Sequence, residues 1–146
     1  MESTPPLAPV YRLYSPGQVA LAAFLGGPFA ACWLLYRNCH RLGQARRARH
    51  CLIWGAVGTV ALTVCTLFLP ERFPSMALPA GYTIGLYQTA HHMHGDIVSA
   101  HRSAGGRLGS WWAVIGIALL GVLCILTLFA VQLGIVTALP ESWIAR

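Results

Sequence analysis

The chain has 146 residues, of which 56% are hydrophobic and 10% are charged, and its formal net charge is +6. A water-soluble domain of this size cannot bury so much apolar surface, so the composition excludes an ordinary soluble protein. All ten basic residues are Arg. The arginine-rich segment 37–50 contains no aromatic residue that could stack on a base, which argues against a nucleic-acid partner.

Residues 1–14 contain three prolines and little periodicity, so we expect a flexible N-terminal tail. A single transmembrane helical domain is expected to follow over 15–146. Three apolar runs in it are long enough to cross a bilayer, and a fourth is weaker. The expected spans are 16–36, 51–69, 76–94 and 111–139.

The first span has a well-marked start and a break in its middle. Ser15 is a good N-cap, Pro16 suits the first helical position, and Gln18 stands at the capping-box position. Proline removes one helical hydrogen bond and presses against the preceding turn, so we expect a kink near mid-membrane. The residues at this break, which also offer a small packing face, are Gly26, Gly27 and Pro28.

The third span is the weakest, because residues 76–90 include Pro79, Gln88 and two glycines. If this segment crosses, the loops 37–50 and 91–110 share one side and hold seven of the ten arginines. That distribution follows the positive-inside rule, so we predict an all-α transmembrane bundle with four spans. Three spans with a re-entrant or interfacial segment are the alternative.

The basic loop between the first two spans sets the predicted orientation. Under the positive-inside rule this loop is cytoplasmic, and four spans then place both termini in the periplasm of a bacterial inner membrane. We expect its guanidinium groups to anchor the topology and to contact the phosphates of the lipid bilayer. The residues concerned are Arg37, Arg41, Arg46, Arg47 and Arg49.

Gly81 and Gly85 form a G-x-x-x-G pair in the third span. Small residues of this kind let helices approach closely in lipid, where no hydrophobic effect drives them together. Two interpretations remain open. The pair joins the helices of one chain to one another, or it forms the interface of a homo-oligomer.

The stretch HHMHGDIVSAH, which begins at His91, holds four of the six histidines and one of the four acidic residues. If the helix continues through it, His91, His94 and His101 share one side and His92 and Asp96 share another. A transition-metal site using His91, His92, His94 and Asp96 would need further ligands, because histidines spread along one stripe cannot reach one ion. A proton-linked role and plain interfacial packing are the competing interpretations, and no other cofactor is expected.

The sequence contains no recognisable catalytic arrangement, such as paired carboxylates, a phosphate-binding loop or an H-E-x-x-H motif. The five cysteines show neither C-x-x-C nor zinc-type spacing, so we expect reduced and mostly buried thiols. We therefore expect a protein that is not an enzyme.

Two stretches resemble a family of small proteobacterial inner-membrane proteins. They are YSPGQVALAAFLGGPFAACWLLYRN (14–38) and HRSAGGRLGSWW (101–112), and together they cover about a quarter of the chain. The resemblance implies an inner-membrane location and no particular activity. Small proteins of this type are sometimes encoded beside secreted toxins as immunity partners.

These observations lead to two functional hypotheses. In the first, the protein binds another membrane or membrane-inserting protein through its helices, for example as an immunity protein against a pore-forming toxin. In the second, it is a small transporter, or a protein that handles a metal or protons with the histidine cluster on the cytoplasmic side.

Overall fold

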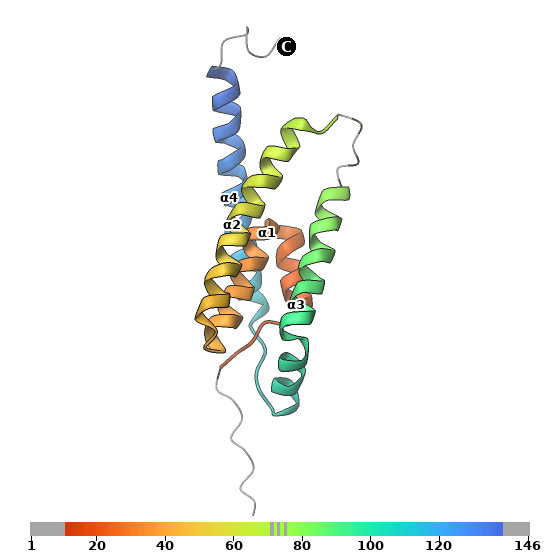
Figure 1. Ribbon diagram of the computed structural model, residues 1–146, viewed down its shortest axis with the longest axis vertical. Coiled ribbons are helices and arrows are strands. Elements are labelled where there is room, and N and C mark those ends of the chain that lie inside the picture. The colour runs from red at the N-terminus through yellow and green to blue at the C-terminus, as the bar shows by residue number, and fades with distance from the viewer. Residues whose placement is uncertain (1–10, 71, 73, 75, 139–146) are drawn as a thin grey trace, which may run out of the picture.

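The structure is a computed structural model that describes residues 11–70, 72, 74 and 76–138 (Figure 1). Within these residues the chain is all-α, as predicted. By length and composition, three helices (α1, α2 and α4) are apolar enough to cross a membrane. The helices are α1 (Pro16–Arg41), α2 (Ala45–Cys65), the short 3-10 helix η1 (Thr66–Phe68), α3 (Ala77–Ser103) and α4 (Trp111–Ala138).

α1 consists of two half-helices that fold back on each other at Gly27. Gly27 has φ 75° and ψ −176°, a backbone conformation that other residues adopt only with strain. Pro28 follows it and suits the first turn of the returning half, because it has no backbone N–H to lose. The backbone N of Tyr14 lies 2.8 Å from Oδ1 of Asn38, although the 24 residues between them would extend about 36 Å in a straight helix. The continuous first span expected over 16–36 is therefore wrong, because the predicted kink is a reversal of direction.

Polar side chains close the base of this hairpin. The Asn38 side-chain amide accepts from the backbone N–H of Tyr14 and donates to the Tyr14 carbonyl, both at 2.8 Å. Gln18 completes the predicted capping box and also donates to the carbonyl of Gly109 at 2.8 Å. Leu13 and Tyr14 are buried, so the expected flexible tail over 1–14 is wrong for these two residues. Residues 1–10 lie outside the described residues.

The reversal of α1 brings three connecting segments to one end of the bundle, which we call the basic end. The guanidinium of Arg41 donates to the carbonyl of Arg12, and the N–H of Gly109 donates to the carbonyl of Leu13 at 2.8 Å. The expectation that the N-terminal segment lies opposite the basic loop is therefore wrong for the described residues. The three segments are residues 11–15, 42–44 and 104–110.

α1 is the centre of the bundle, since every close pair among the four α-helices includes it except a short contact between α2 and α4. A Cβ added at Gly121 of α4 would overlap the carbonyl of Gly26 in α1. Likewise, a Cβ at Gly55 of α2 would overlap the side chain of Cys32 in α1. Glycine at these positions lets the backbones of α2 and α4 approach the hairpin closely.

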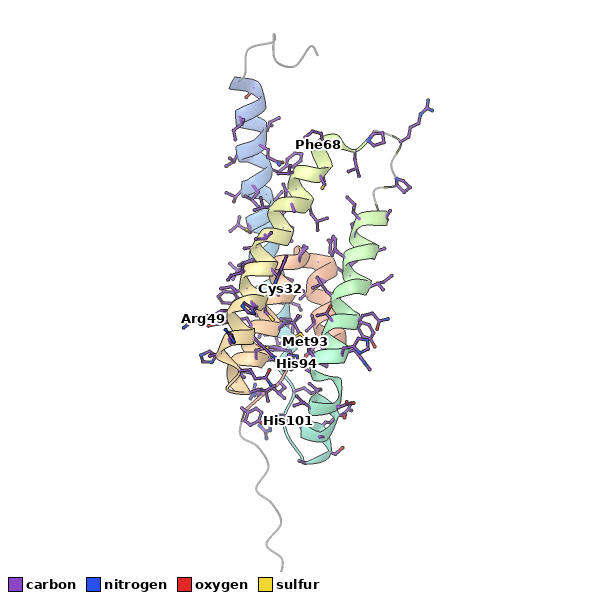
Figure 2. All side chains as sticks on the ribbon, in the orientation of Figure 1. Cys32, Arg49, Phe68, Met93, His94 and His101 are labelled. Carbon is purple, nitrogen blue, oxygen red and sulfur yellow. The ribbon has the colours of Figure 1, made fainter. Side chains whose placement is uncertain are left out.

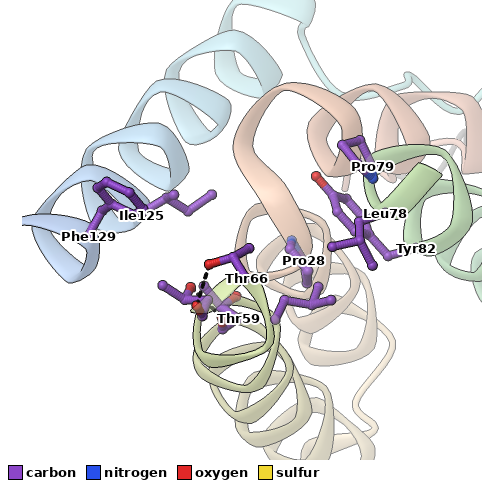
Figure 3. A pocket seen from close by; sticks show the side chains of 10 residues that line it. Pro28, Thr59, Thr66, Leu78, Pro79, Tyr82, Ile125 and Phe129 are labelled. Carbon is purple, nitrogen blue, oxygen red and sulfur yellow. Dashed lines mark hydrogen bonds between the residues drawn. The ribbon is translucent and has the colours of Figure 1, made fainter. Parts of the chain in front are cut away.

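The other helices extend past the hairpin tip and diverge there, as Figure 1 shows. Beside Pro28, a cavity of about 260 Å³ remains between α2, α3 and α4 (Figure 3). Its walls are mainly apolar, and the hydroxyls of Thr59, Thr63 and Thr66 are bonded to carbonyls of their own segment. This cavity therefore offers few free polar groups to a ligand.

Candidate functional site

The histidine stretch lies on one continuous helix, because α3 runs through Gly95 to Ser103. His94 is buried and faces α1, whereas His91, His92 and Asp96 are exposed. Among the described residues, no group of three or more His, Cys, Asp or Glu side chains is arranged to hold a metal ion. The structure thus does not bring the four predicted metal ligands together.

His101 lies at the basic end, next to Tyr11 and Arg107. Its ring stacks on Tyr11 with 4.9 Å between the ring centroids. Its Nε2 lies 3.4 Å from the carbonyl of Arg107. His101 and His94 are both buried on the α1 side of α3, as the helical spacing predicts for this pair.

Buried His94 contacts a cysteine that the sequence did not link to it. Its Nε2 lies 3.5 Å from Sγ of Cys39, near the end of α1, and its buried Nδ1 has no hydrogen-bond partner among the residues that the structure describes. Cys39 is fully buried. The contact between Cys39 and His94 therefore joins the end of α1 to α3.

An open cavity of about 680 Å³ lies among α1, α2 and α3, and we call it the basic-end cavity. Figure 2 shows Cys32, Met93 and His94 in this region, with Arg49 on α2 beside it. Polar, sulfur-containing and apolar side chains all contribute to its wall. The lining includes Cys51, Arg47, His50, His92, Met93 and Trp54.

The five predicted anchor arginines separate into two groups. Arg37 donates to the hydroxyl of Tyr14 at 3.4 Å, and Arg41 lies over the Tyr14 ring, 5.6 Å from its centroid. These two cations support the hairpin base. Arg46, Arg47 and Arg49 are exposed on the first turns of α2, which begins at residue 45 instead of the expected 51. Arg47 also donates to Gln44 and lines the basic-end cavity, and lipid contact remains a prediction for all three.

Gly81 and Gly85 lie on a side of α3 that no other described helix covers. No described atom outside the local helix backbone lies within 4 Å of a Cβ added at either position. Gln88 shares this side, because the three residues fall within an arc of about 60° at 100° per residue. All three residues are exposed, and we call them the α3 outer face. The expectation that the glycine pair joins helices within one chain is therefore wrong, and the oligomer or partner interpretation stays open.

The geometry provides three distinct features: the hairpin of α1, the basic-end cavity with its His, Cys and Arg lining, and an uncovered face of α3. No protein-family model, curated protein or solved structure matches the chain. The functional conclusions below therefore depend on the residues and their arrangement.

Proposed function

We propose that this chain is a small, non-enzymatic inner-membrane protein that acts by binding another membrane or membrane-inserting protein through the α3 outer face. Gln88 is the observation that supports this most directly. Its side chain is exposed one turn from Ile84 and Gly85, and within the described residues no hydrogen-bond partner is found for it. An amide in hydrocarbon is stabilised by a partner helix that supplies a hydrogen bond, and Gly81 and Gly85 allow that helix to approach closely.

The proposed topology has three crossing helices, α2, α3 and α4, around the re-entrant hairpin α1. The 27 residues of α3 extend about 40 Å, enough to cross a hydrocarbon core of about 30 Å despite the polar composition of the inner part. The basic end is placed in the cytosol, because it carries eight of the ten arginines. This arrangement puts the described N-terminal residues inside and the end of α4 outside.

Protection against a pore-forming toxin is the concrete form of this proposal. A toxin helix that inserts into the same membrane presents the long apolar surface and backbone that a glycine-bearing face can pack against. Binding it before it assembles would prevent the pore without any chemical step. The test is to express the protein in sensitive cells and to measure membrane depolarisation after contact with toxin-producing cells. Equal depolarisation with and without the protein, across the membrane-targeting toxins tried, contradicts the immunity form.

The partner-binding proposal is tested with variants of the α3 outer face. Gly85→Ile and Gln88→Leu should abolish stoichiometric co-purification of a partner in mild detergent. Gly116→Ile is the matched control, since an added Cβ at Gly116 in α4 also meets no atom within 4 Å. A second, differently tagged copy of the chain distinguishes a homo-oligomer from a complex with another protein. Recovery of monomers alone, under conditions that keep other membrane complexes intact, contradicts the proposal.

The lining of the basic-end cavity supports a second candidate, a small transporter or a protein that handles a metal or protons. His50, His92, Cys51 and Met93 line one open cavity, although a bound ion would have to draw them closer together than they now lie. Metal analysis of protein purified without a histidine tag tests this candidate. It predicts stoichiometric metal that is lost in His50→Ala and His92→Ala variants. Metal-free protein whose variants behave like the wild type contradicts it.

A further inference from the structure

The basic-end cavity and the cavity beside Pro28 follow one another along the gap between α2 and α3. On α1, Cys32 lines the first cavity, and Pro28, one helical turn away, lines the second. On α3, Leu86 lines the first cavity, and Tyr82, again one turn away, lines the second. α2 and α3 make no close approach to each other within the described residues, which leaves both cavities open to the surroundings. We call the two cavities together the α2–α3 groove.

One side of α3 lines the whole length of this groove. Its wall residues there recur at spacings of four, three and four, which places them on one side of a helix. They are Tyr82, Leu86, Thr89 and Met93. The α3 outer face points about 100° away from this side, so the groove and that face are separate surfaces.

The chemistry of the groove differs between its two ends. At the basic end its lining includes the guanidinium of Arg47 and the imidazoles of His50 and His92, but no acidic residue. Asp96, one turn beyond His92 on α3, is not part of this lining. Beside Pro28 the wall is mainly apolar. A molecule that fits the whole groove therefore has an anionic end and a long apolar end.

We propose that the α2–α3 groove binds one anionic phospholipid from the leaflet at the basic end. Its phosphate lies among Arg47, His50 and His92, and one acyl chain follows the groove to the cavity beside Pro28. A guanidinium binds a phosphate through paired N–H groups, and each imidazole can donate one further hydrogen bond. Because no acidic residue lines this end, it favours a headgroup with a net negative charge.

The dimensions of the groove fit this ligand. From His50 to Leu62, one residue in each cavity, α2 rises about 18 Å over 12 residues. One leaflet occupies about half of a hydrocarbon core of about 30 Å, so this rise covers the depth of one acyl chain. The larger cavity, of about 680 Å³, lies at the headgroup end, and the smaller one, of about 260 Å³, lies at the chain end. Trp54 also lines the headgroup end, where indole rings commonly lie in membrane proteins.

The experiment uses the full chain in mild detergent with equal amounts of phosphatidylglycerol and phosphatidylcholine that carry the same acyl chains. Native mass spectrometry then counts the lipids that stay bound. We expect one phosphatidylglycerol per chain and about tenfold less phosphatidylcholine, because only the first has a net negative headgroup. An excess of inorganic phosphate should leave the lipid bound, since the acyl chain contributes to binding. Equal retention of the two lipids, or displacement by inorganic phosphate, overturns the proposal.

The arginines at the start of α2 provide matched variants for the headgroup. Arg47→Gln should lower the retention of phosphatidylglycerol about tenfold, because it removes the guanidinium from the groove. Arg46→Gln and Arg49→Gln are the controls, since both arginines are equally exposed but do not line the groove. Both controls should retain the lipid like the wild type. An equal loss in all three variants indicates diffuse attraction to the charge of the basic end and overturns the site, as does unchanged retention in Arg47→Gln.

A second pair of variants tests the wall of the groove. Thr89→Trp should displace the lipid while Arg47 remains in place, because the indole fills part of the groove. Thr127→Trp on α4 is the matched control, since both threonines are exposed and bond to a carbonyl of their own helix, but Thr127 lines neither cavity. Equal retention of phosphatidylglycerol in the two variants overturns the assigned groove.

Photocrosslinking tests the path of the acyl chain. Phosphatidylglycerol with a photoreactive group at the end of one chain should label Leu62 and Tyr82 beside the second cavity. Adducts spread evenly over these residues and the exposed Leu119 and Leu123 of α4 contradict the path. None of these measurements involves the α3 outer face, so the lipid site and the proposed partner binding can fail independently.

Discussion

Asn38→Ala is the sharpest test of the hairpin, because Asn38 joins two chain positions that a straight helix would keep far apart. The amide of Asn38 is buried and satisfies both the N–H and the carbonyl of Tyr14. Alanine removes both bonds and leaves two backbone groups without partners. Each such group costs about 1–3 kcal/mol when it stays dry. Water can reach the basic end, so we expect a loss of about 3 kcal/mol in the free energy of unfolding.

The assay is reversible unfolding in mixed micelles with increasing mole fractions of a denaturing detergent. Gln44→Ala is the matched control, because it also removes an amide, but one whose hydrogen bond to Arg47 at 3.3 Å is exposed. We expect the control to change stability by less than about 0.5 kcal/mol. Similar stability of the two variants would refute the reasoning, since it would mean that Asn38 does not close a dry hairpin base.

Three further predictions follow from the same contacts. Gly121→Ala should destabilise the protein by about 1–3 kcal/mol, because the new Cβ overlaps the Gly26 carbonyl, whereas Gly116→Ala should be neutral or slightly stabilising in the same unfolding assay. Gln18→Leu should cost about 1–3 kcal/mol, because it removes both the bond to Gly109 and one half of the capping box; unchanged unfolding contradicts this role. Membrane-impermeant labelling of tags placed before residue 11 and in the 42–44 connection should give the same sidedness, and a tag after residue 138 should give the opposite one.

The sequence was a reliable guide to local features of the chain. Ser15 and Gln18 form the predicted capping box, and the helix breaks at Gly27 and Pro28 as predicted. These features depend on neighbouring residues, so short-range chemistry decides them. The continuity of α3 through Gly95 shows the limit of this argument, since one glycine weakens a helix without ending it.

Hydropathy could not reveal the reversal of α1. A run of apolar residues has the same composition whether it crosses a membrane once or enters and returns. Asn38 with Tyr14 fixes the direction of the returning half, and Gln18 with Gly109 joins the start of α1 to the loop before α4; the partners are 24 and 91 residues apart. No local pattern contains such pairings. The contact of Cys39 with His94, 55 residues apart, was missed for the same reason.

The spacing of glycines in the sequence also did not predict which pairs of helices pack closely together. The G-x-x-x-G pair on α3 meets no other helix in the described part of the chain, whereas Gly121 and Gly55, which belong to no G-x-x-x-G pair, make close approaches to α1. Close packing needs a small residue at the crossing point of two particular helices, and the crossing point is a property of the tertiary fold. The spacing predicted that small faces exist and could not say which helix each one meets.

The hairpin explains why so much of the other helices remains uncovered. Irregular backbone at membrane depth is tolerated only where protein surrounds it, and the turn at Gly27 lies against Ile125 of α4. α2, α3 and α4 each use one side to enclose α1, which leaves their remaining sides to the surroundings. Leucine and valine on those sides suit lipid, as Leu119 and Leu123 of α4 do. Gln88 does not, so the α3 outer face is where we expect a second protein rather than lipid to complete the structure.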